Sequence, residues 1–286
     1  MVIESRVAIV TGAASGMGEA LAKDLHAQGW IVACVDLNRQ AGESLAKSLG
    51  GNARFFYADV ADYDSQSAMF AHVWQTWGRI DALCANAGIV DRSSVYILSH
   101  RGNRVSDIPP APDLSCTDID YKGVVYGTQL AVHFMRHNKV PGGKIVCTAS
   151  IAGVFPHQSY PEYSGAKAAV VNFVRCVAPV LKIKENITVN AVLPGIVQTS
   201  IIPKELVDAV RPDCVTPIST IVAGYNRFLK DDTLNGQILE GSADKLLAYG
   251  LPEPMNGHAT VRAYTVWDPL FKMLHNENSG LPNALP

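Results

Sequence analysis

The sequence of 286 residues predicts a doubly wound α/β fold, in which about seven parallel strands are flanked by helices. Short runs of apolar and β-branched residues alternate with longer stretches of helical pattern. The short runs are continuously apolar, which is typical of parallel strands that helices cover on both faces. We expect strands at residues 6–10, 31–35, 54–57, 80–85, 144–149, 187–192 and 237–239, and helices at 18–28, 41–49, 64–77, 119–138, 162–182 and 219–230.

The composition excludes several classes of protein. Hydrophobic residues make up 48% of the chain and charged residues 17%, which is enough apolar material for a large core. The 24 basic and 26 acidic residues give a net charge of −2 without a polycationic block, so we expect no nucleic-acid partner. No apolar run reaches the roughly 18–20 residues that span a bilayer, so we expect no membrane partner.

Targeting and metal signals are also missing from the pattern. The first residues lead directly into a strand without the apolar region of a signal peptide. The six cysteines are scattered without a Cys-x2-Cys pair, which suits a reducing compartment and gives no zinc spacing. His133 and His137 have a spacing that can ligate metal, but no acidic third ligand is suggested. We expect a cytoplasmic protein without a metal.

Two segments interrupt the alternation of strands and helices. Residues 90–117 form a long polar loop with three prolines, and loops of this length in compact domains are commonly functional. Because ligands of parallel sheets bind at the carboxyl ends of the strands, we expect this loop to overhang the site. We expect one domain at residues 1–240, with this substrate loop and a lid at 200–230, and a tail at 241–286 that packs on the domain or on a neighbouring subunit.

Three glycines follow the first predicted strand directly. Gly12, Gly16 and Gly18 have the spacing Gly-x3-Gly-x-Gly, and a helix follows at once. Glycines here allow a tight turn and let the backbone approach a pyrophosphate, whose charge faces the helix N-terminus. The turn, which includes Ser15 and Met17, predicts a dinucleotide site.

An acidic residue at the end of the second strand predicts which dinucleotide binds. Asp36 comes 18 residues after Gly18 and is followed by Leu37. A carboxylate at this position accepts hydrogen bonds from the adenosine ribose and repels a 2′-phosphate. Arg39 is the only nearby cation, and we expect it to be solvated. The sequence therefore predicts NAD rather than NADP.

A second group of residues lies in the other half of the chain. Tyr163 and Lys167 are four residues apart in a predicted helix, and Ser150 follows the fifth strand. With these residues, the chain resembles the short-chain dehydrogenase/reductase family in its soluble single-domain branch. The resemblance covers residues ~5–240 and implies a Rossmann fold that binds NAD. It is also carried by Asp59-Val60, Asn86-Ala87-Gly88, and Pro194-Gly195 with Val197 and Thr199.

The resemblance implies a role for each of the three residues. Tyr163 would be the general base in oxidation or the general acid in reduction. Because a free phenol has a pKa of about 10, it needs help near neutral pH. Lys167, one helical turn away, supplies a positive charge that favours the phenolate and would hold the nicotinamide ribose. Ser150 would donate a hydrogen bond to the substrate oxygen.

The resemblance also implies a cofactor site along the strand ends. Asp59 and Val60 would face the adenine, Asn86 would pack against the adenosine ribose, and Val197 and Thr199 would bind the carboxamide. The expected cofactor-binding residues are Gly12, Ser15, Gly16, Met17, Gly18, Asp36, Leu37, Asp59, Val60, Asn86, Gly88, Tyr163, Lys167, Gly195, Val197 and Thr199.

One position departs from the family's pattern. Asp120 stands where the family usually carries an Asn that holds a water in a proton relay through the lysine. An ionised Asp offers only acceptors. We expect it to hold the water and its charge to pair with Lys167 across that water. We therefore count Asp120 with the catalytic residues; the alternatives are a working enzyme with a modified relay and a crippled one.

Two short segments are similar to fungal and animal relatives of 15-hydroxyprostaglandin dehydrogenase, at residues 109–114 and 215–217. This similarity implies NAD-linked oxidation of a secondary alcohol on an apolar molecule, without specifying the substrate. The expected substrate pocket is made by residues 90–96, 151–155 and 200–215 together with Tyr160.

Three functions remain open from the sequence. The leading prediction is an NAD-dependent secondary-alcohol dehydrogenase. The second is a ketoreductase that runs the reverse reaction, and the third is a non-catalytic nucleotide-binding protein on the same fold. The family resemblance further implies a homodimer or homotetramer, formed through the helices at 119–138 and 162–182.

Overall fold

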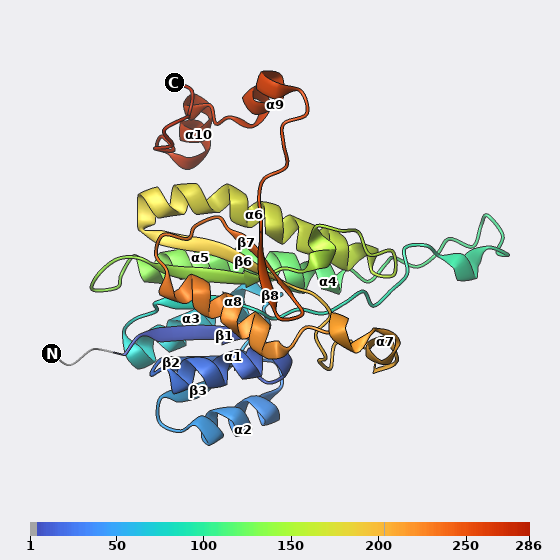
Figure 1. Cartoon of the computed structure of the whole chain (residues 1–286), viewed down its shortest axis with the longest axis horizontal. Coiled ribbons are helices and arrows are strands. Elements are labelled where there is room, and N and C mark those ends of the chain that lie inside the picture. The colour runs from blue at the N-terminus through green and yellow to red at the C-terminus, as the bar shows by residue number, and fades with distance from the viewer. Residues whose placement is uncertain (1–4, 203) are drawn as a thin grey trace.

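The computed structural model describes residues 5–202 and 204–286 and contains an eight-stranded sheet between two layers of helices (Figure 1). Residues 1–4 of the predicted domain and residue 203 of the predicted lid lie outside the described residues. The strands are β1 (Val7–Thr11), β2 (Ile31–Asp36), β3 (Ala53–Tyr57), β4 (Ala82–Ala85), β5 (Gly143–Thr148), β6 (Ile187–Pro194), β7 (Ile238–Ser242) and β8 (Lys245–Tyr249).

The helices follow the strands in the alternation that the sequence predicts. Between α4 and α5 lies one turn of π-helix, Asp118–Lys122, so the three pieces form a continuous helical run. The helices are α1 (Gly16–Ala27), α2 (Arg39–Leu49), α3 (Tyr63–Trp77), α4 (Ser115–Thr117), α5 (Gly123–Met135), α6 (Pro161–Glu185), α7 (Lys204–Ala209), α8 (Ile218–Lys230), α9 (Gly257–Tyr264) and α10 (Asp268–His275).

The order of the strands is β3-β2-β1-β4-β5-β6-β7-β8. The first seven strands are parallel, which confirms the predicted doubly wound sheet. Because the strand order reverses between β1 and β4, a crevice opens at their carboxyl ends, where ligands of such sheets bind. The eighth strand was not predicted: β8 turns back and pairs antiparallel with β7, so the first part of the predicted tail belongs to the sheet.

Alternate residues of the central strands enter two separate cores. Val7 and Ile9 of β1 face a core that also contains side chains of α3, α5 and α6. Ala8 and Val10 face the opposite core with α1, α2 and α8. This double burial explains why the strands are continuously apolar in the sequence.

The predicted lid and substrate loop differ from expectation. Residues 218–230 of the lid form α8, whose Tyr225 and Phe228 are buried in the core, so only the part before α8 lies outside the core. Between its two ends, which stay at the body, the loop at residues 90–117 projects outward instead of lying over the sheet (Figure 1). Val105 and Ile108 near its tip are exposed.

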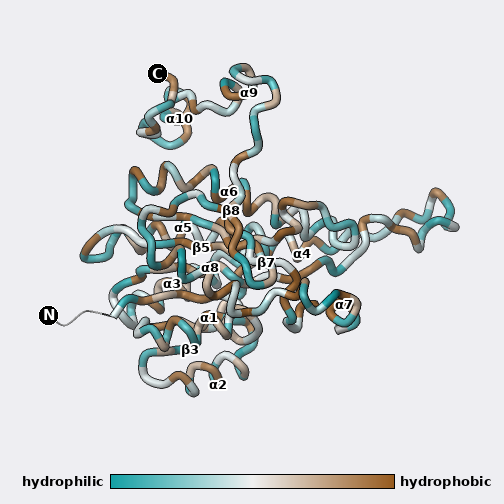
Figure 2. Tube along the Cα trace, viewed as in Figure 1, coloured by the Kyte–Doolittle hydropathy of each residue, from teal (hydrophilic) through white to brown (hydrophobic). Residues whose placement is uncertain are grey.

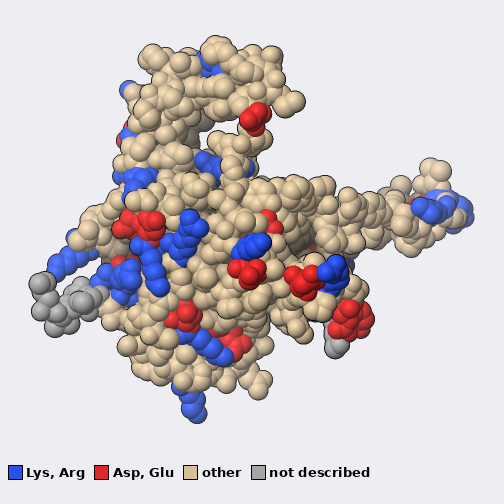
Figure 3. Space-filling model, in the orientation of Figure 1, with Lys and Arg blue, Asp and Glu red and all other residues tan. Residues whose placement is uncertain are grey.

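The tail beyond β8 forms a small separate layer above α6 (Figure 1). An extended segment leads to α9 and α10, and none of the described residues of these two helices is buried. Leu270, Met273 and Leu274 of α10 remain exposed, and hydrophobic stretches are visible along both the tail and the projecting loop (Figure 2). A hollow separates the tail from the body, and basic and acidic side chains intermingle on the face shown in Figure 3.

Candidate active site at the carboxyl ends of the strands

The predicted glycine turn has the geometry of a dinucleotide cradle. Gly12 and Gly16 adopt φ angles of +66° and +55°, which L side chains rarely adopt. A Cβ on Gly18 would lie 2.1 Å from the Gly12 carbonyl oxygen, so only glycine fits there. Thr199 lies against Gly16, because a Cβ on Gly16 would be 3.2 Å from its Cγ2. The glycines therefore let the chain turn tightly into α1, whose first residues, with Ser15, line the cavity.

Asp36 ends β2 and its carboxylate organises the neighbouring loop. Its Oδ2 accepts a hydrogen bond from the Ala14 amide at 2.9 Å, and its Oδ1 accepts one from the Asn38 amide at 2.8 Å. Arg39 is exposed and lies beside Glu43 and over the Tyr57 ring, as the expectation of a solvated cation requires. The position of Asp36 at the rim of the cavity fits recognition of ribose hydroxyls.

Asn86 connects three adjacent strands. Its side-chain nitrogen donates to the Thr11 carbonyl at 3.0 Å, and its oxygen accepts a hydrogen bond from Thr148 Oγ1 at 3.1 Å. The Asn86 amide also donates to Thr11 Oγ1 at 2.9 Å. Since these bonds occupy both ends of its side chain, Asn86 holds the strand ends together where it lines the cavity.

Ser150 and Lys167 are brought together by a close approach of two backbones. Ser150 begins a short 3₁₀ turn, Ile151–Gly153, and its Oγ accepts a hydrogen bond from the Ala152 amide at 3.1 Å. A Cβ on Gly153 would lie 2.7 Å from the Lys167 carbonyl, so glycine is required at this contact with α6. The turn therefore packs directly against the helix that carries Tyr163.

Lys167 makes a direct, buried ion pair with Asp120. The ammonium Nζ lies 2.9 Å from Asp120 Oδ2, and the two side chains are 3% and 0% exposed. Nζ also donates to the Thr148 carbonyl at 2.9 Å and lies 5.6 Å from the centre of the Tyr163 ring. The expectation that a water separates the two charges is wrong, because this contact leaves no room for one.

The π-helical turn at Asp118–Lys122 explains how Asp120 reaches the lysine. Such turns occur frequently at functional sites, where they redirect a side chain. Asp120 Oδ1 accepts a hydrogen bond from the Ile89 amide at 2.9 Å, which fixes the carboxylate between two strand ends and the helix.

The buried pair shifts the pKa values of both partners. Burial raises the pKa of the Asp120 carboxyl above its ordinary value, and the Lys167 ammonium opposes that shift. Burial also lowers the pKa of Lys167, but the negative charges of Asp120 and of a Tyr163 phenolate outweigh it, so the lysine pKa is raised. Lys167 therefore keeps its positive charge across the neutral range.

The structure brings most of the predicted cofactor residues to one cavity. Two of the predicted residues do not line this cavity. Gly18 is packed against the carbonyl of Gly12, and Val197 is buried in the core. Gly195 and the four predicted catalytic residues do not line this cavity either. The predicted residues that do are Gly12, Ser15, Gly16, Met17, Asp36, Leu37, Asp59, Val60, Asn86, Gly88 and Thr199.

Sequence reasoning missed several residues around the site. Arg92 also lines the cavity, so Arg39 is not the only cation nearby. Thr148 contacts both Asn86 and Lys167, which its place at the end of β5 could have suggested. Asp91 and Glu162 contact the turn of Tyr163, and only the adjacency of Glu162 to Tyr163 in the sequence signals this.

Asp91, Cys116 and Glu162 form a cluster whose ligand atoms lie within 4.8 Å of one another. The groups already have partners inside the protein: Asp91 and Glu162 accept backbone hydrogen bonds, and Cys116 Sγ lies 3.5 Å from the Ile89 carbonyl. Each of the three groups is thus engaged within the protein, which argues against a bound metal at this cluster.

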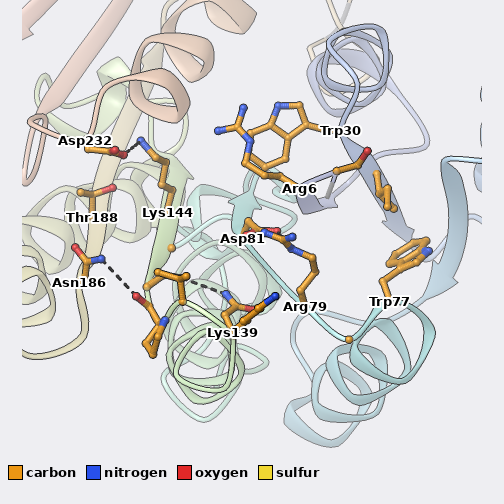
Figure 4. A pocket seen from close by; sticks show the side chains of 18 of the residues that line it. Arg6, Trp30, Trp77, Arg79, Asp81, Lys139, Lys144, Asn186, Thr188 and Asp232 are labelled. Atoms are coloured by element: carbon orange, nitrogen blue, oxygen red, sulfur yellow. Dashed lines mark hydrogen bonds and ion pairs between the residues drawn. The ribbon is translucent and has the colours of Figure 1, made fainter. Parts of the chain in front are cut away.

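A second cavity, of about 730 Å³, lies at the opposite edge of the sheet (Figure 4). Lys144 pairs with Asp232 at 2.5 Å, and the Arg6 guanidinium lies 4.0 Å from the centre of the Trp30 ring. Its lining residues come from the amino ends of the strands. Because ligands of parallel sheets bind at the carboxyl ends, this cavity is separate from the candidate site.

Residues 6–208 match the family model described as short chain dehydrogenase. The chain therefore belongs to the short-chain dehydrogenase family of oxidoreductases, and the predicted family is confirmed. No helix in residues 5–202 or 204–286 has the length and apolarity needed to cross a membrane.

Individual relatives extend this comparison. The chain is 59% identical to the short-chain dehydrogenase/reductase prx6 of Penicillium rubens, over 99% of this chain and 98% of that protein. It is 29% identical to mouse 15-hydroxyprostaglandin dehydrogenase [NAD(+)], over 86% of this chain and 93% of that protein. The fold is similar to that of a 3-ketoacyl-(acyl-carrier-protein) reductase from Brucella melitensis complexed with NADH, with a TM-score of 0.72, 22% identity, and coverage of 84% of this chain and 98% of that one.

Proposed function

We propose that this protein is an NAD-dependent dehydrogenase that interconverts a secondary alcohol and a ketone on an apolar small molecule. The observation that carries the proposal is the charged Lys167, which is buried beside the ring of Tyr163 and held by Asp120 and Thr148. A fixed positive charge next to a phenol is what that phenol needs to act as a base near neutral pH.

NAD is the proposed cofactor because the residues at the cavity fit it. The glycine turn brings the backbone at the start of α1 to the cavity, where it would face a pyrophosphate, and the Asp36 carboxylate lies at the cavity rim, where it would meet the ribose. A 2′-phosphate at that position would meet the negative charge of Asp36. The NAD-dependent mouse relative and the NADH named with the Brucella structure support this choice.

In the oxidation that we propose, Tyr163 takes the proton of the substrate hydroxyl as the carbon–oxygen bond becomes a carbonyl. A bound oxidised nicotinamide would supply the acceptor for the hydride that leaves the same carbon. Ser150 donates a hydrogen bond to the substrate oxygen, which limits the charge that develops there. Lys167 has three N–H donors, and Asp120 and Thr148 occupy two, so one is left for the nicotinamide ribose.

An apolar substrate is proposed from the side chains around the opening of the site. Phe155 is 59% exposed, and Ile201, at the start of the predicted lid, lines the cofactor cavity. Phe155 also meets the ring of Tyr249 of β8, with ring centroids 6.4 Å apart. Exposed apolar side chains beside a polar catalytic group suit a hydrophobic alcohol.

The reverse direction uses the same residues. With Tyr163 protonated, the hydroxyl donates its proton to the forming alkoxide, and Ser150 and Lys167 keep their places. The ketoreductase named in the Brucella structure supports this second reading. Which direction dominates depends on the ratio of oxidised to reduced cofactor in the cell.

The test is turnover of an apolar secondary alcohol, such as decalol, with NAD and with NADP, followed at the nicotinamide absorbance. We expect NAD-linked turnover that is lost in Tyr163→Phe while NAD binding, measured by calorimetry, is kept. The non-catalytic alternative would be supported if the wild type binds NAD but turns over no alcohol or ketone, so that its rate equals that of Tyr163→Phe.

We also propose that the protein is a homodimer or homotetramer. A cavity of about 1130 Å³ is lined by α5, α6 and α10, with partly exposed apolar residues such as Val125, Phe173 and Val180. The charges at its edges are paired within the chain, Arg136 with Glu185 and Lys184 with Glu277. Two copies of this face can therefore meet without repulsion between like charges.

Light scattering tests the assembly against the chain mass of 30.7 kDa. We expect a multiple of that mass for the wild type and a monomer for Val180→Glu. Val140→Glu is the control, because Val140 is exposed and lines the second cavity but not this face. A monomeric wild type would contradict the proposal.

A further inference from the structure

Both ends of the projecting loop at residues 90–117 are attached to the first turn of α6. At the start of the loop, Asp91 Oδ1 accepts a hydrogen bond from the Tyr163 amide at 2.7 Å, and Oδ2 accepts one from the Glu162 amide at 3.0 Å. At the end of the loop, Glu162 Oε1 accepts hydrogen bonds from the Thr117 amide at 2.8 Å and its hydroxyl at 2.9 Å. Two consecutive residues of α6 thus hold both ends.

The bonds from Asp91 satisfy amides that the helix itself leaves open. The first amides of an α-helix have no partner within the helix, and a nearby side chain usually accepts them. Tyr160, which precedes α6, makes no such bond with its side chain. Asp91 provides it from 71 residues away, and its negative charge also faces the positive end of the helix. The backbone of Tyr163 is therefore fixed by a residue of the loop.

Further contacts make the base of the loop a defined structure. Asp113 and Ser93 bind each other across its neck, with the Asp113 amide donating to Ser93 Oγ at 2.9 Å. The Tyr96 hydroxyl donates to the Gln158 carbonyl at 2.8 Å, just before α6. Beyond this neck the loop exposes apolar side chains, among them Leu98. A hydrophobic molecule that contacts the loop would therefore shift the turn that carries Tyr163, because the loop is bonded to that turn.

We propose that Asp91 and Glu162 are positioning residues that couple the 90–117 loop to Tyr163, so that an apolar substrate held by the loop sets the place of the phenol. This inference rests on the proposed function of Tyr163. A shift of about 1 Å in a catalytic group can cost 100-fold in rate, so a loosened turn has a measurable effect. The loop thereby contributes to selection of bulky over small alcohols.

The first experiment compares Asp91→Ala, the milder Asp91→Asn and the control Asp107→Asn in the full-length protein. Asp107 lies in the same loop, and its side-chain partners among the described residues, Arg104 and Ser106, lie within that loop. We expect Asp91→Ala to lower kcat for decalol tenfold or more, with the dissociation constant of NAD unchanged and Asp107→Asn like the wild type. Equal kcat values in Asp91→Ala and Asp107→Asn would overturn the proposal.

A second measurement does not depend on turnover. Hydrogen exchange of the peptide that spans residues 158–166 should accelerate in Asp91→Ala, and in Asp91→Asn if the alanine variant does not fold, but not in Asp107→Asn. Unchanged exchange would show that Asp91 does not hold the turn. Faster exchange with an unchanged kcat would mean a purely structural role and would also overturn the proposal.

A third variant tests the selection of substrate. Replacing residues 94–112 by Gly-Gly keeps both anchored ends, because Ser93 and Asp113 already contact each other. We expect turnover of decalol to fall at least tenfold more than turnover of cyclohexanol. An equal loss on both alcohols would contradict a role of the loop in selection. If the wild type and Tyr163→Phe turn over neither alcohol, the proposed function fails. If the wild type turns over an alcohol and the Asp91 variants do so at the same rate, only the coupling is refuted.

Discussion

The Lys167 ammonium and the Asp120 carboxylate form a direct contact of 2.9 Å in which neither side chain is more than 3% exposed. The carboxylate partly offsets the field of the ammonium at Tyr163, whose ring centre lies 5.6 Å from Lys167 Nζ. A buried charge that loses its partner costs about 3–5 kcal/mol, which makes the pair a fixed part of the fold. Asp120 is therefore placed to control how strongly Lys167 acts on the phenol.

Asp120→Asn removes the negative charge while keeping the shape of the side chain. The uncompensated Lys167 should then act more strongly on the phenol, so the pH–rate profile of Asp120→Asn should differ from that of the wild type. Asp118→Asn is the matched control, because Asp118 is on the same turn but exposed and paired with Lys122. Identical profiles and rates for both variants would contradict the idea of a modified relay.

Gly18→Ala tests the glycine cradle. The added Cβ would lie 2.1 Å from the Gly12 carbonyl oxygen, so the turn must open and the fold should lose about 2–3 kcal/mol. We expect NAD binding to be abolished at the same time. Gly51→Ala, where no atom lies within 4 Å of the new Cβ, should change neither the thermal midpoint nor the NAD affinity appreciably. Normal NAD binding in Gly18→Ala would be evidence against the cradle.

Asp36→Asn tests the choice between NAD and NADP. Loss of the negative charge should remove the repulsion of a 2′-phosphate and shift the ratio of NADP to NAD affinities at least tenfold toward NADP, which is about 1.4 kcal/mol. Asp62→Asn is the control, because Asp62 also accepts backbone amides, at the start of α3, but does not line the cavity. An unchanged ratio in calorimetry would remove Asp36 from cofactor selection.

The cysteines should differ sharply in reactivity. Burial raises the pKa of the Cys34 and Cys147 thiols to about 12, so almost no thiolate exists at pH 8 and these groups should not react with a thiol reagent. Burial also raises the pKa of Cys84 and Cys116. We expect only two fast thiols in the native chain, the exposed Cys176 and Cys214, and six after denaturation. Because Cys176 lines the face between α5 and α6, assembly should slow its reaction, which titration at increasing protein concentration would show.

The sheet could be predicted because its strands carry the pattern that double burial imposes. Val7 and Ile9 enter one core and Ala8 and Val10 the other, so the run between Arg6 and Thr11 is apolar throughout. The strand β8 escaped prediction because it follows β7 without an intervening helix and pairs antiparallel with it at the edge of the sheet, where three of its five residues are exposed.

The site could be predicted only where residues close in sequence act together. The glycine turn and the pair of Tyr163 and Lys167 are local patterns, and they indicate their chemistry directly. Asp91 acts on Tyr163 across 72 positions, and nothing in its neighbourhood signals that contact. The direct contact of Asp120 with Lys167 depends on a π-helical turn, whose position the apolar periodicity does not reveal.

That turn makes the length of the chain between Cys116 and Gly123 as critical as its composition. A π-helical turn holds one residue more than an α-helical turn, so deleting one residue at Asp118–Lys122 would convert the turn to regular α-helix. Val124 would then keep its place in the core, but Asp120 would no longer be placed against the lysine. Substitutions at the exposed Lys122 should therefore be tolerated far better than any deletion in this segment.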